Sequence, residues 1–451
     1  MSKIEVDAID KQSGSTLTLG GSGTAVTLAA GATQSGFGRT GTVDWQTGSI
    51  KTATFTAASG EGYFCNTTSG SFTVNLPAGS AGAIVSVQDY NNTFDSNGLT
   101  VAPNGSEKIN GGQAGGPILL NTEGEGLTLV YIDGTVGWRS IQDSSFADTG
   151  SSFITATGGT ITTSGDCKIH TFTGPGTFTV TCTALCAANN EVSYVVVAGG
   201  GGGGSGITTS SGAGGAGGYR ETKSPVTPYT ASPLDGQPSA PNRITVTATA
   251  FPITVGAGGA GGAASPPIAC GTAGSNSIFS TIIATGGGKG AKEVLAGGNG
   301  GSGGGGGGIG SGTPAGGSGN TPPTTPAQGT NGGTGGANPA QGGGGGGGAT
   351  AAGGAGSGSS GGNGGAGATS SINGTPTTRG GGGAGANSYG LGSVGSPGPG
   401  GGGTAGNDNP AGNGTTNTGG GGGAVGGCAP NGTKSGGTGG SGIVIIRYKF
   451  Q

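Results

Sequence analysis

His170 is the only histidine of the chain, and it is therefore the one imidazole available for acid–base chemistry near neutral pH. A Ser–His–Asp arrangement would pair it with Asp166, the nearest acid in the sequence. His170 falls in a segment that predicts a strand, and no nucleophile motif surrounds it. We therefore predict that His170 is structural, that the chain has no catalytic residue, and that it is not an enzyme.

Two segments, 212–217 and 256–261, match the G-x-G-x-x-G pattern that holds the pyrophosphate of a dinucleotide. Neither of them opens a helical pattern, and Gly288-Lys289 lacks the Ser or Thr that would complete a phosphate-binding loop. In so glycine-rich a chain, such matches arise by chance. We predict no cofactor.

Metal ligands are sparse in this sequence. Asp408 stands in Asn407-Asp408-Asn409-Pro410, which lacks the spacing of a calcium loop and predicts a plain turn. Cys182 and Cys186 have too few companions for a zinc site. We predict no metal site.

The six cysteines are too few for a disulfide scaffold in 451 residues. Two pairings remain open. Cys167 would pair with Cys182 or Cys186 after release into an oxidising medium, and Cys270 would pair with Cys428.

Side chains suited to binding stand in the segments that interrupt the glycine tracts. Aromatic residues and arginine are common in binding hot spots. The candidate contacts to a receptor are Tyr219, Arg220, Tyr229, Arg243, Arg379, Tyr389 and Asp408. The alternative for Tyr219 and Tyr389 is that they only seal the ends of the glycine segments.

Glycine dominates the composition, since 120 of the 451 residues are Gly and 90 of these lie in residues 199–451. This half lacks the side chains of an ordinary core, and it has no Gly-X-Y period of collagen. No apolar run is long enough for a membrane span, and the start has no signal-peptide pattern. A pI near 5.2 argues against nucleic acid as a partner.

Short alternating segments with Gly, Asn, Pro or Ser between them predict β structure before the glycine half. Residues 1–41 predict strands that attach to another protein, and residues 42–146 predict a sandwich or barrel-like domain. The expected strands of this domain are Thr52–Ala57, Gly62–Asn66, Phe72–Leu76, Ile84–Asp89, Leu99–Ala102, Ile118–Asn121, Leu127–Ile132 and Trp138–Ile141.

Residues 147–198 predict a second β segment that leads into the glycine half. Lys168–Thr173 and Thr177–Cys182 flank Gly174-Pro175-Gly176 and predict a hairpin. The apolar run Tyr194–Ala198 predicts a strand buried on both faces. The chain closes with a strong strand pattern, Ile443–Tyr448, which we expect to pair with Tyr194–Ala198.

Backbone hydrogen bonds are the interaction available to order residues 199–451, because glycine loses the most entropy on folding. Extended helices of three residues per turn leave their N–H and C=O groups free for neighbours, and without Cβ atoms they can approach closely. We predict a polyglycine-II bundle in which Gly tracts are rods and Pro-, Thr- and Asn-bearing segments are turns, with essentially no α-helix. The alternative is that residues 199–451 form a flexible linker.

Several motifs resemble bacteriophage tail-fibre proteins. Residues 42–141, with Gly62-Tyr-Phe-Cys-Asn-Thr-Thr68, Phe72-Thr-Val-Asn-Leu-Pro77 and Gly137-Trp138, resemble a β domain recurrent in tail fibres. Residues 157–180 resemble a segment of fibre proteins from marine phages of cyanobacteria, as do the start Val195–Gly204 and the end Gly439–Tyr448. The tip adhesins of T-even phage long tail fibres are similar in design, because in them a sandwich of glycine helices presents variable loops to the host.

The resemblance implies a structural virion protein, a tail fibre or receptor-binding adhesin without catalysis. It implies a homotrimer assembled in the host cytoplasm and exposed on the virion. The N-terminus would bind other virion or tail proteins, and the glycine half would bind a host glycan or outer-membrane protein. The alternative is a capsid or virion decoration fibre without a specific receptor. A depolymerase would need a carboxylate pair, which the acid-poor glycine half hardly offers.

Overall fold

The computed structural model describes residues 43–141, 153–184, 187–207, 209–264, 267–308, 312–337, 341–388, 391–407, 409–426 and 434–451. The predicted attachment strands in residues 1–41 lie outside these ranges. The chain divides into two compact units, Met1–Ala147 and Asp148–Gln451. Its described residues form strands, two short 3-10 turns (Ala187–Asn190 and Ala240–Asn242) and no α-helix, which confirms the all-β prediction.

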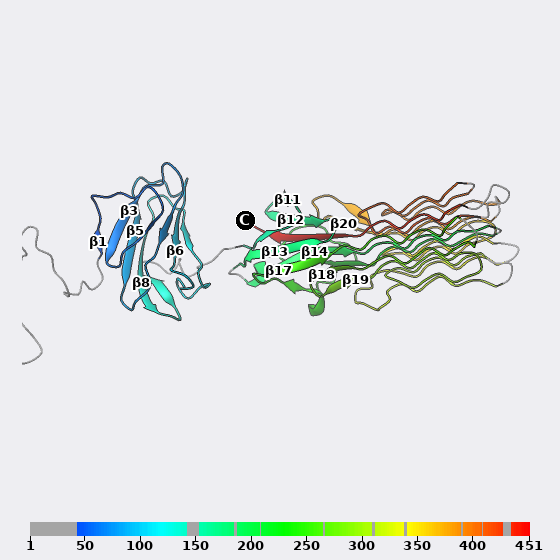
Figure 1. Ribbon diagram of the computed structural model, residues 1–451, viewed down its shortest axis with the longest axis horizontal. Helices are drawn as coiled ribbons and strands as arrows, with labels where there is room; N and C mark the ends of the chain where they lie inside the picture. The colour runs from blue at the N-terminus through cyan, green and yellow to red at the C-terminus, as the bar shows by residue number, and fades with distance from the viewer. Residues whose placement is uncertain are drawn as a thin grey trace, which may run out of the picture. The chain divides into compact units, whose positions relative to one another are not determined.

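The N-terminal unit is a sandwich of two sheets (Figure 1). One sheet has the order β1-β3-β5-β8-β9 and the other has the order β2-β4-β6-β7. The strands are β1 (Asp44–Trp45), β2 (Phe55–Thr56), β3 (Glu61–Cys65), β4 (Thr73–Asn75), β5 (Ile84–Asp89), β6 (Leu99–Ala102), β7 (Ile118–Leu120), β8 (Gly126–Asp133) and β9 (Gly137–Ser140).

The first six strands alternate between the two sheets, so their neighbours within a sheet run parallel. The inward side chains of both sheets form one core, which includes Val74, Leu99, Leu120 and Trp138 together with Phe94 from a loop. The alternation of apolar and polar residues in the sequence places these side chains on the inner faces. The unit therefore buries a core of its own within a single chain.

The C-terminal unit begins with a second pair of sheets. One has the order β10-β13-β17-β18-β19, and the other has the order β11-β12-β22-β14-β15, with β16 paired to β14. The strands are β10 (Thr155–Thr157), β11 (Thr160–Ser164), β12 (Cys167–Phe172), β13 (Gly176–Cys182), β14 (Glu191–Val197), β15 (Tyr219–Thr222), β16 (Ile244–Thr245), β17 (Ala250–Thr254), β18 (Ser277–Phe279), β19 (Ile282–Ala284) and β22 (Ile443–Lys449).

The closing strand β22 lies between β12 and β14 in the middle of its sheet (Figure 1). Its pairing with β14 is antiparallel and joins Val197 to Ile443 and Tyr194 to Ile446, which confirms the expected pairing. Alternate side chains of β14 enter two cores. Tyr194 and Val196 pack between the two sheets, and Val195 and Val197 pack on the opposite face.

The predicted hairpin over Lys168–Thr173 and Thr177–Cys182 is wrong. β12 and β13 belong to different sheets, and Gly174-Pro175 crosses between them. β12 pairs instead with β11 and β22, and β13 pairs with β10 and β17. Phe172 and Phe178 face the same core from opposite sheets, because this arrangement buries both rings between two layers.

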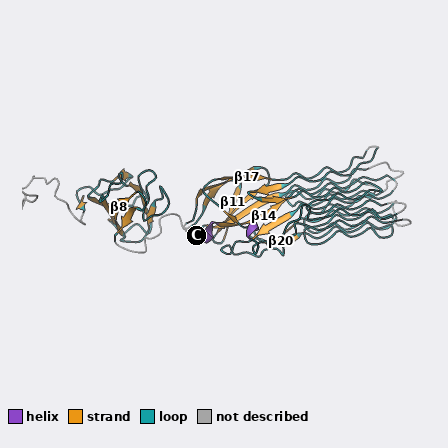
Figure 2. Cartoon of the chain, turned by 90° about the horizontal axis from the view of Figure 1, so that it is seen from below, coloured by secondary structure: helices purple, strands orange, loops and turns teal. Residues whose placement is uncertain are grey.

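Beyond these sheets the chain runs back and forth as extended glycine rods, which Figure 2 shows as loops that lie side by side. The rod 199–205 follows β14 and demonstrates the bonding. Its N–H groups donate on three faces in turn, and each face recurs every third residue. Gly199 and Gly202 donate to Ser275 and Thr272, Gly200 and Gly203 donate to Gly440 and Gly437, and Gly201 and Gly204 donate to Gly215 and Gly212.

The carbonyl groups of this rod accept from other rods with the same period. Gly287 and Gly290 donate to Gly199 and Gly202, Gly259 and Gly262 donate to Gly200 and Gly203, and Gly422 and Val425 donate to Gly201 and Gly204. A period of three with bonds only to neighbours is the pattern of a polyglycine-II lattice. The predicted bundle is therefore confirmed.

Glycine is required where a rod is enclosed. A Cβ added at Gly203 would lie 1.9 Å from the carbonyl oxygen of Gly423, and one at Gly204 would lie 2.0 Å from that of Ala291. On a rod at the bundle surface, 256–262, one residue in three is exposed, and Ala257 and Ala260 occupy those positions. On this surface rod the side chains therefore fall at the exposed third of the positions, whereas the interior rod 212–218 accommodates Ala213 and Ala216 as buried side chains.

Candidate functional site: the two ends of the rods

The rods alternate in direction, so their ends fall into two groups. One end joins the sheets, because rods continue into β15, β18 and β22 (Figure 1). The other end carries the turns that return one rod to the next. The described residues of the turns at this far end include 206–207, 209–211, 292–296, 357–360, 387–388 and 391–394.

Exposed aliphatic side chains occur at the far end. Val294 and Leu295 lie in one turn, and Leu391 and Val394 lie in another. They are between 39% and 63% exposed. In the sequence, these aliphatic residues stand singly or as one pair in Gly-rich segments and are not part of a strand pattern. This isolation is the feature by which the sequence could have identified them as exposed.

Two turns at the far end are tied together by Glu293. Its Oε1 accepts the backbone N–H groups of Ile207 and Thr209. A second tie is the Ser211 hydroxyl, whose oxygen lies 2.7 Å from the carbonyl oxygens of Gly204 and Val425 and accepts the N–H of Val425. Polar side chains therefore hold neighbouring far-end turns in fixed positions.

Five of the receptor contacts predicted from the sequence are among the described residues, and none of these five lies at the far end. Tyr219 and Arg220 belong to β15, Tyr229 and Arg243 lie in the segment between β15 and β16, and Arg379 ends β21 (Thr377–Arg379), which pairs with β20 (Ala368–Ser370). All of these segments adjoin the sheets. Tyr389 and Asp408 lie outside the described residues.

Burial is at odds with receptor contact for two of these residues. Tyr219 is 1% exposed and Arg379 is 5% exposed, so neither offers a surface to a partner. Arg220 donates from Nη2 to Asn242 Oδ1 over 2.6 Å, and Arg243 donates from Nε to the carbonyl of Gln237 over 2.9 Å. The alternative that Tyr219 seals a rod end is consistent with its position directly after the rod 212–218.

Glu221 organises the polar groups where the rods meet the sheets, a region that we call the junction, and no motif in the sequence distinguishes this residue. Its carboxylate is buried and accepts from Tyr219 Oη over 2.8 Å, from Ser232 N over 3.0 Å and from Ser370 Oγ over 2.6 Å. These bonds join β15, the loop that follows it and β20. A buried carboxylate bonded in this way holds these segments together.

Burial dominates the electrostatics of the junction. It raises the pKa of Tyr219 well above the ordinary value, and the Glu221 carboxylate adds to this shift. Burial also lowers the pKa of Arg379, although Tyr219 and Glu221 act in the opposite direction. Tyr219 therefore stays a neutral hydrogen-bond donor throughout the physiological range of pH.

Arg447 of β22 fastens the other side of the junction. Its guanidinium donates to the carbonyl groups of Ile372 over 3.1 Å, Pro228 over 2.9 Å and Ser164 over 3.3 Å. It also lies over the ring of Tyr229 at 5.5 Å from the centroid. The closing strand therefore binds two loops and the end of β11 through one side chain.

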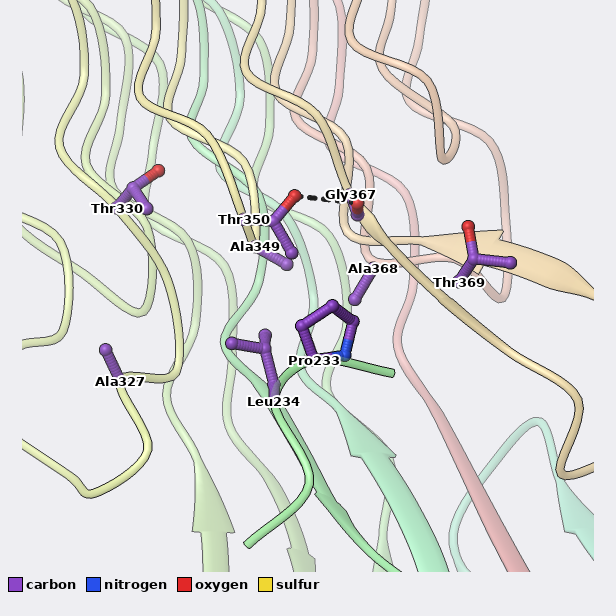
Figure 3. A pocket seen from close by; sticks show the side chains of 9 residues that line it. All are labelled: Pro233, Leu234, Ala327, Thr330, Ala349, Thr350, Gly367, Ala368 and Thr369. Carbon is purple, nitrogen blue, oxygen red and sulfur yellow. Dashed lines mark hydrogen bonds between the residues drawn. The ribbon is translucent and has the colours of Figure 1, made fainter. Parts of the chain in front are cut away.

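A hollow of about 450 Å³ opens beside this junction (Figure 3). Pro233 and Leu234 face Ala349 and Ala368 across it, and Thr350 donates from Oγ1 to the carbonyl of Gly367 over 3.0 Å. The remaining lining residues are Ala327, Thr330, Gly367 and Thr369. None of the lining side chains is ionisable, so the hollow offers no acid or base for catalysis.

His170 is enclosed between the two sheets. Its Nδ1 lies 2.7 Å from the carbonyl of Gly158 and its Nε2 lies 3.2 Å from Tyr448 Oη. A carbonyl only accepts, so Nδ1 carries the proton and Nε2 accepts from the tyrosine. Burial lowers the pKa of His170. Both nitrogens are occupied, which fits the structural role expected for this residue.

The cysteines that are described are not cross-linked as expected. Cys167 is a free, buried thiol, and Cys270 is free and accepts the N–H of Lys292 at 3.4 Å. Cys182 donates to the carbonyl of Thr183. The predicted disulfides of Cys167 and Cys270 are therefore absent from this structure. Cys186 and Cys428 lie outside the described residues.

Both G-x-G-x-x-G segments are rods of the lattice and do not open a helix. Within the described ranges, no group of three or more His, Cys, Asp or Glu side chains is placed to hold a metal ion. In that same part of the chain, no helix has the length and apolar character needed to cross a bilayer.

Two facing sheets that continue into a lattice of glycine rods define a glycine-rich all-β protein. The model of a family described as a glycine-rich domain matches residues 171–449, more than half of the chain, and the chain belongs to this family. The match begins in β12 and ends at Lys449, the last residue of β22. No curated protein matches the chain.

Proposed function

We propose that the chain is a structural virion protein, a phage tail fibre or receptor-binding adhesin that attaches the virus to its host without catalysis. The observation that carries the proposal is the arrangement of the rods. They are joined to sheets at one end, and their turns at the other end carry exposed aliphatic side chains. A lattice held by main-chain bonds leaves turn sequences free to vary without loss of a core.

The chemistry of the far end favours contact with a protein or glycan surface. Exposed apolar side chains that are held by fixed backbone commonly mark interaction sites. Pre-organised turns lose little entropy when they bind, and the ties made by Glu293 and Ser211 supply that order. Membership of the glycine-rich domain family is consistent with this reading, and the tail-fibre assignment itself rests on the sequence resemblance.

Adsorption to host cells tests the proposal. The variant Val294→Ser, Leu295→Ser, Leu391→Ser changes exposed turn residues at the far end and leaves the rods intact. We expect the fluorescently labelled variant to bind host cells at least about tenfold more weakly than the wild type, which corresponds to about 1.4 kcal/mol.

The matched control is Ile161→Ser with Ile283→Ser, which removes exposed apolar side chains of β11 and β19 beside the sheets. Its binding is expected to equal that of the wild type. If both variants bind host cells as strongly as the wild type and unfold at the same temperature, the proposed role of the far end is contradicted. Location of the chain on the capsid by electron microscopy would favour the decoration fibre instead.

A further inference from the structure

Three Asn-Gly pairs stand on surface rods in the same hydrogen-bonded arrangement. They are Asn299-Gly300, Asn363-Gly364 and Asn413-Gly414. In each pair, the glycine N–H donates to the carbonyl of one residue on a neighbouring parallel rod, and the asparagine Oδ1 accepts the N–H of that same residue. We call this arrangement the Asn-Gly clamp.

The geometry of the clamp is nearly constant. The clamped residue is Ser318 for the first pair, with distances of 3.1 Å from Gly300 N and 2.8 Å to Asn299 Oδ1. The corresponding distances are 2.8 Å and 2.8 Å for Ser396, and 2.8 Å and 2.9 Å for Thr438. All three asparagines are exposed.

The clamp replaces a missing rod. In the interior, the N–H and C=O groups of one residue bind two different rods, as Gly199 does with Ser275 and Gly287. A residue on a surface rod lacks one of these neighbours, and the clamped residues Ser318, Ser396 and Thr438 are exposed, so without the asparagine their N–H groups would have only water as a partner. The asparagine carboxamide supplies the carbonyl oxygen that the missing rod would have given.

An Asn-Gly pair is also a reactive dipeptide. The glycine nitrogen can attack the asparagine Cγ to form a C–N bond, while the side-chain nitrogen leaves as ammonia with the proton of the attacking amide. Water then opens the five-membered succinimide to Asp or isoaspartate. Glycine permits this reaction because it has no side chain to hinder the ring closure.

We propose that the three Asn-Gly clamps are latent deamidation sites that the closed bundle protects and that opening of a surface rod exposes. In the closed clamp, the attacking nitrogen donates its hydrogen to the neighbouring rod, and the second bond fixes the carboxamide oxygen on that rod. Isoaspartate adds one carbon to the main chain and one negative charge. The three-residue period is then broken, so a modified rod cannot close again, and the modification is an irreversible record of opening.

Peptide mass spectrometry of the aged full chain tests the proposal. Asn104-Gly105 in the N-terminal unit is the internal reference, because it is exposed and stands outside the lattice. At pH 8 and 37 °C in the folded chain, we expect deamidation at the three clamps to be at least about tenfold slower than at Asn104. In urea the four sites should react at similar rates. Equal rates in the folded chain would overturn the proposal.

A local variant separates clamp protection from general stability. In Gly395→Ala, the added Cβ would lie 2.1 Å from the carbonyl oxygen of Gly362 and would displace the rod that carries Ser396. We expect faster deamidation at Asn363 alone, with Asn299 and Asn413 unchanged. Ser396→Ala is the matched control, because it keeps the clamped N–H and C=O groups. An unchanged rate at Asn363, or an equal increase at all three sites, would show that the clamp is not the protecting element.

Discussion

At the scale of single residues, the absence of a side chain is the main structural determinant of the rods. Gly203 illustrates this, because the carbonyl oxygen of Gly423 on an adjacent rod lies where a Cβ atom of residue 203 would be. Residues with side chains are accommodated where the lattice leaves room, as at Ala213 and Ala384, or at the surface, as at Ala260. Identical glycines in the sequence therefore differ greatly in their tolerance of substitution.

Gly203→Ala is expected to lower the free energy of unfolding by about 3 kcal/mol or more, because backbone atoms of two rods would have to separate. Thermal and urea unfolding measure the change. The matched control Ala260→Ser alters an exposed side chain of a surface rod and should change stability by less than about 0.5 kcal/mol. A similar loss in both variants would contradict the close packing of the rods.

His170 predicts a specific dependence of stability on pH. Burial lowers its pKa in the folded chain, whereas the unfolded chain has the ordinary value of about 6.5. Below pH 6.5 the unfolded state binds a proton that the folded state does not, so stability falls as the pH decreases toward the folded pKa. Between the two pKa values the slope is about 1.4 kcal/mol per pH unit.

Urea unfolding of the wild type and of His170→Gln from pH 7.5 to pH 5 isolates this contribution, because the chain has no other histidine. The glutamine variant should lack this part of the acid sensitivity, although the carboxylates still titrate. Parallel pH profiles for the two proteins would show that His170 is equally easy to protonate in both states.

At the scale of elements, β22 is the piece that unites the C-terminal unit. It separates β12 from β14, and its side chains enter the cores on both faces of its sheet. The rod 436–442 continues directly into it, so the sheet and the lattice share one segment of chain. We infer that the sheets and the rods unfold together.

Ile446→Ala tests this coupling. The side chain is fully buried between the sheets, and its removal should cost about 2–5 kcal/mol. Hydrogen exchange should accelerate at Gly437 and Gly440 in the rod as well as at Tyr194 in β14. Lys449→Ala, at the end of the strand, is the control. Acceleration confined to the sheet would show that the rods are independently stable.

The sequence predicted the elements better than their partners. Ile84–Asp89 and Leu99–Ala102 are strands with the predicted bounds, because alternation and turn residues are local signals. The pairing of β12 with β22 joins residues far apart in the chain, and no local pattern distinguishes it from a hairpin with β13. The choice depends on which arrangement buries both phenylalanine rings.

The described candidate contacts lie beside the sheets for a related reason. Composition identified the breaks between glycine tracts but not the end of the bundle at which each break falls. Rods alternate in direction, so the segment after the second rod, which holds Tyr219 and Tyr229, returns to the sheets. The burial of Arg379 and the role of Glu221 depend on tertiary packing, which the sequence does not display.

At the scale of the whole molecule, the assembly implied by the resemblance remains a prediction. The N-terminal unit buries its own core within one chain, so assembly would use surface side chains such as Tyr90, Leu119 and Ile132, which are exposed in this structure. A homotrimer predicts a mass of three times 41.4 kDa. Sedimentation equilibrium of the full chain measures it, and a monomer at micromolar concentration would contradict the trimer.

The glycine interior also has a consequence for calorimetry. Ordinary domains gain about 12–15 cal/mol/K per residue in heat capacity on unfolding, because apolar surface meets water, whereas newly hydrated polar surface lowers this quantity. Unfolding of the rods exposes mostly peptide groups and few hydrocarbon side chains to water. The C-terminal unit should therefore have a small heat-capacity change per residue, and its free energy of unfolding should vary with temperature along a nearly straight line, with little loss in the cold.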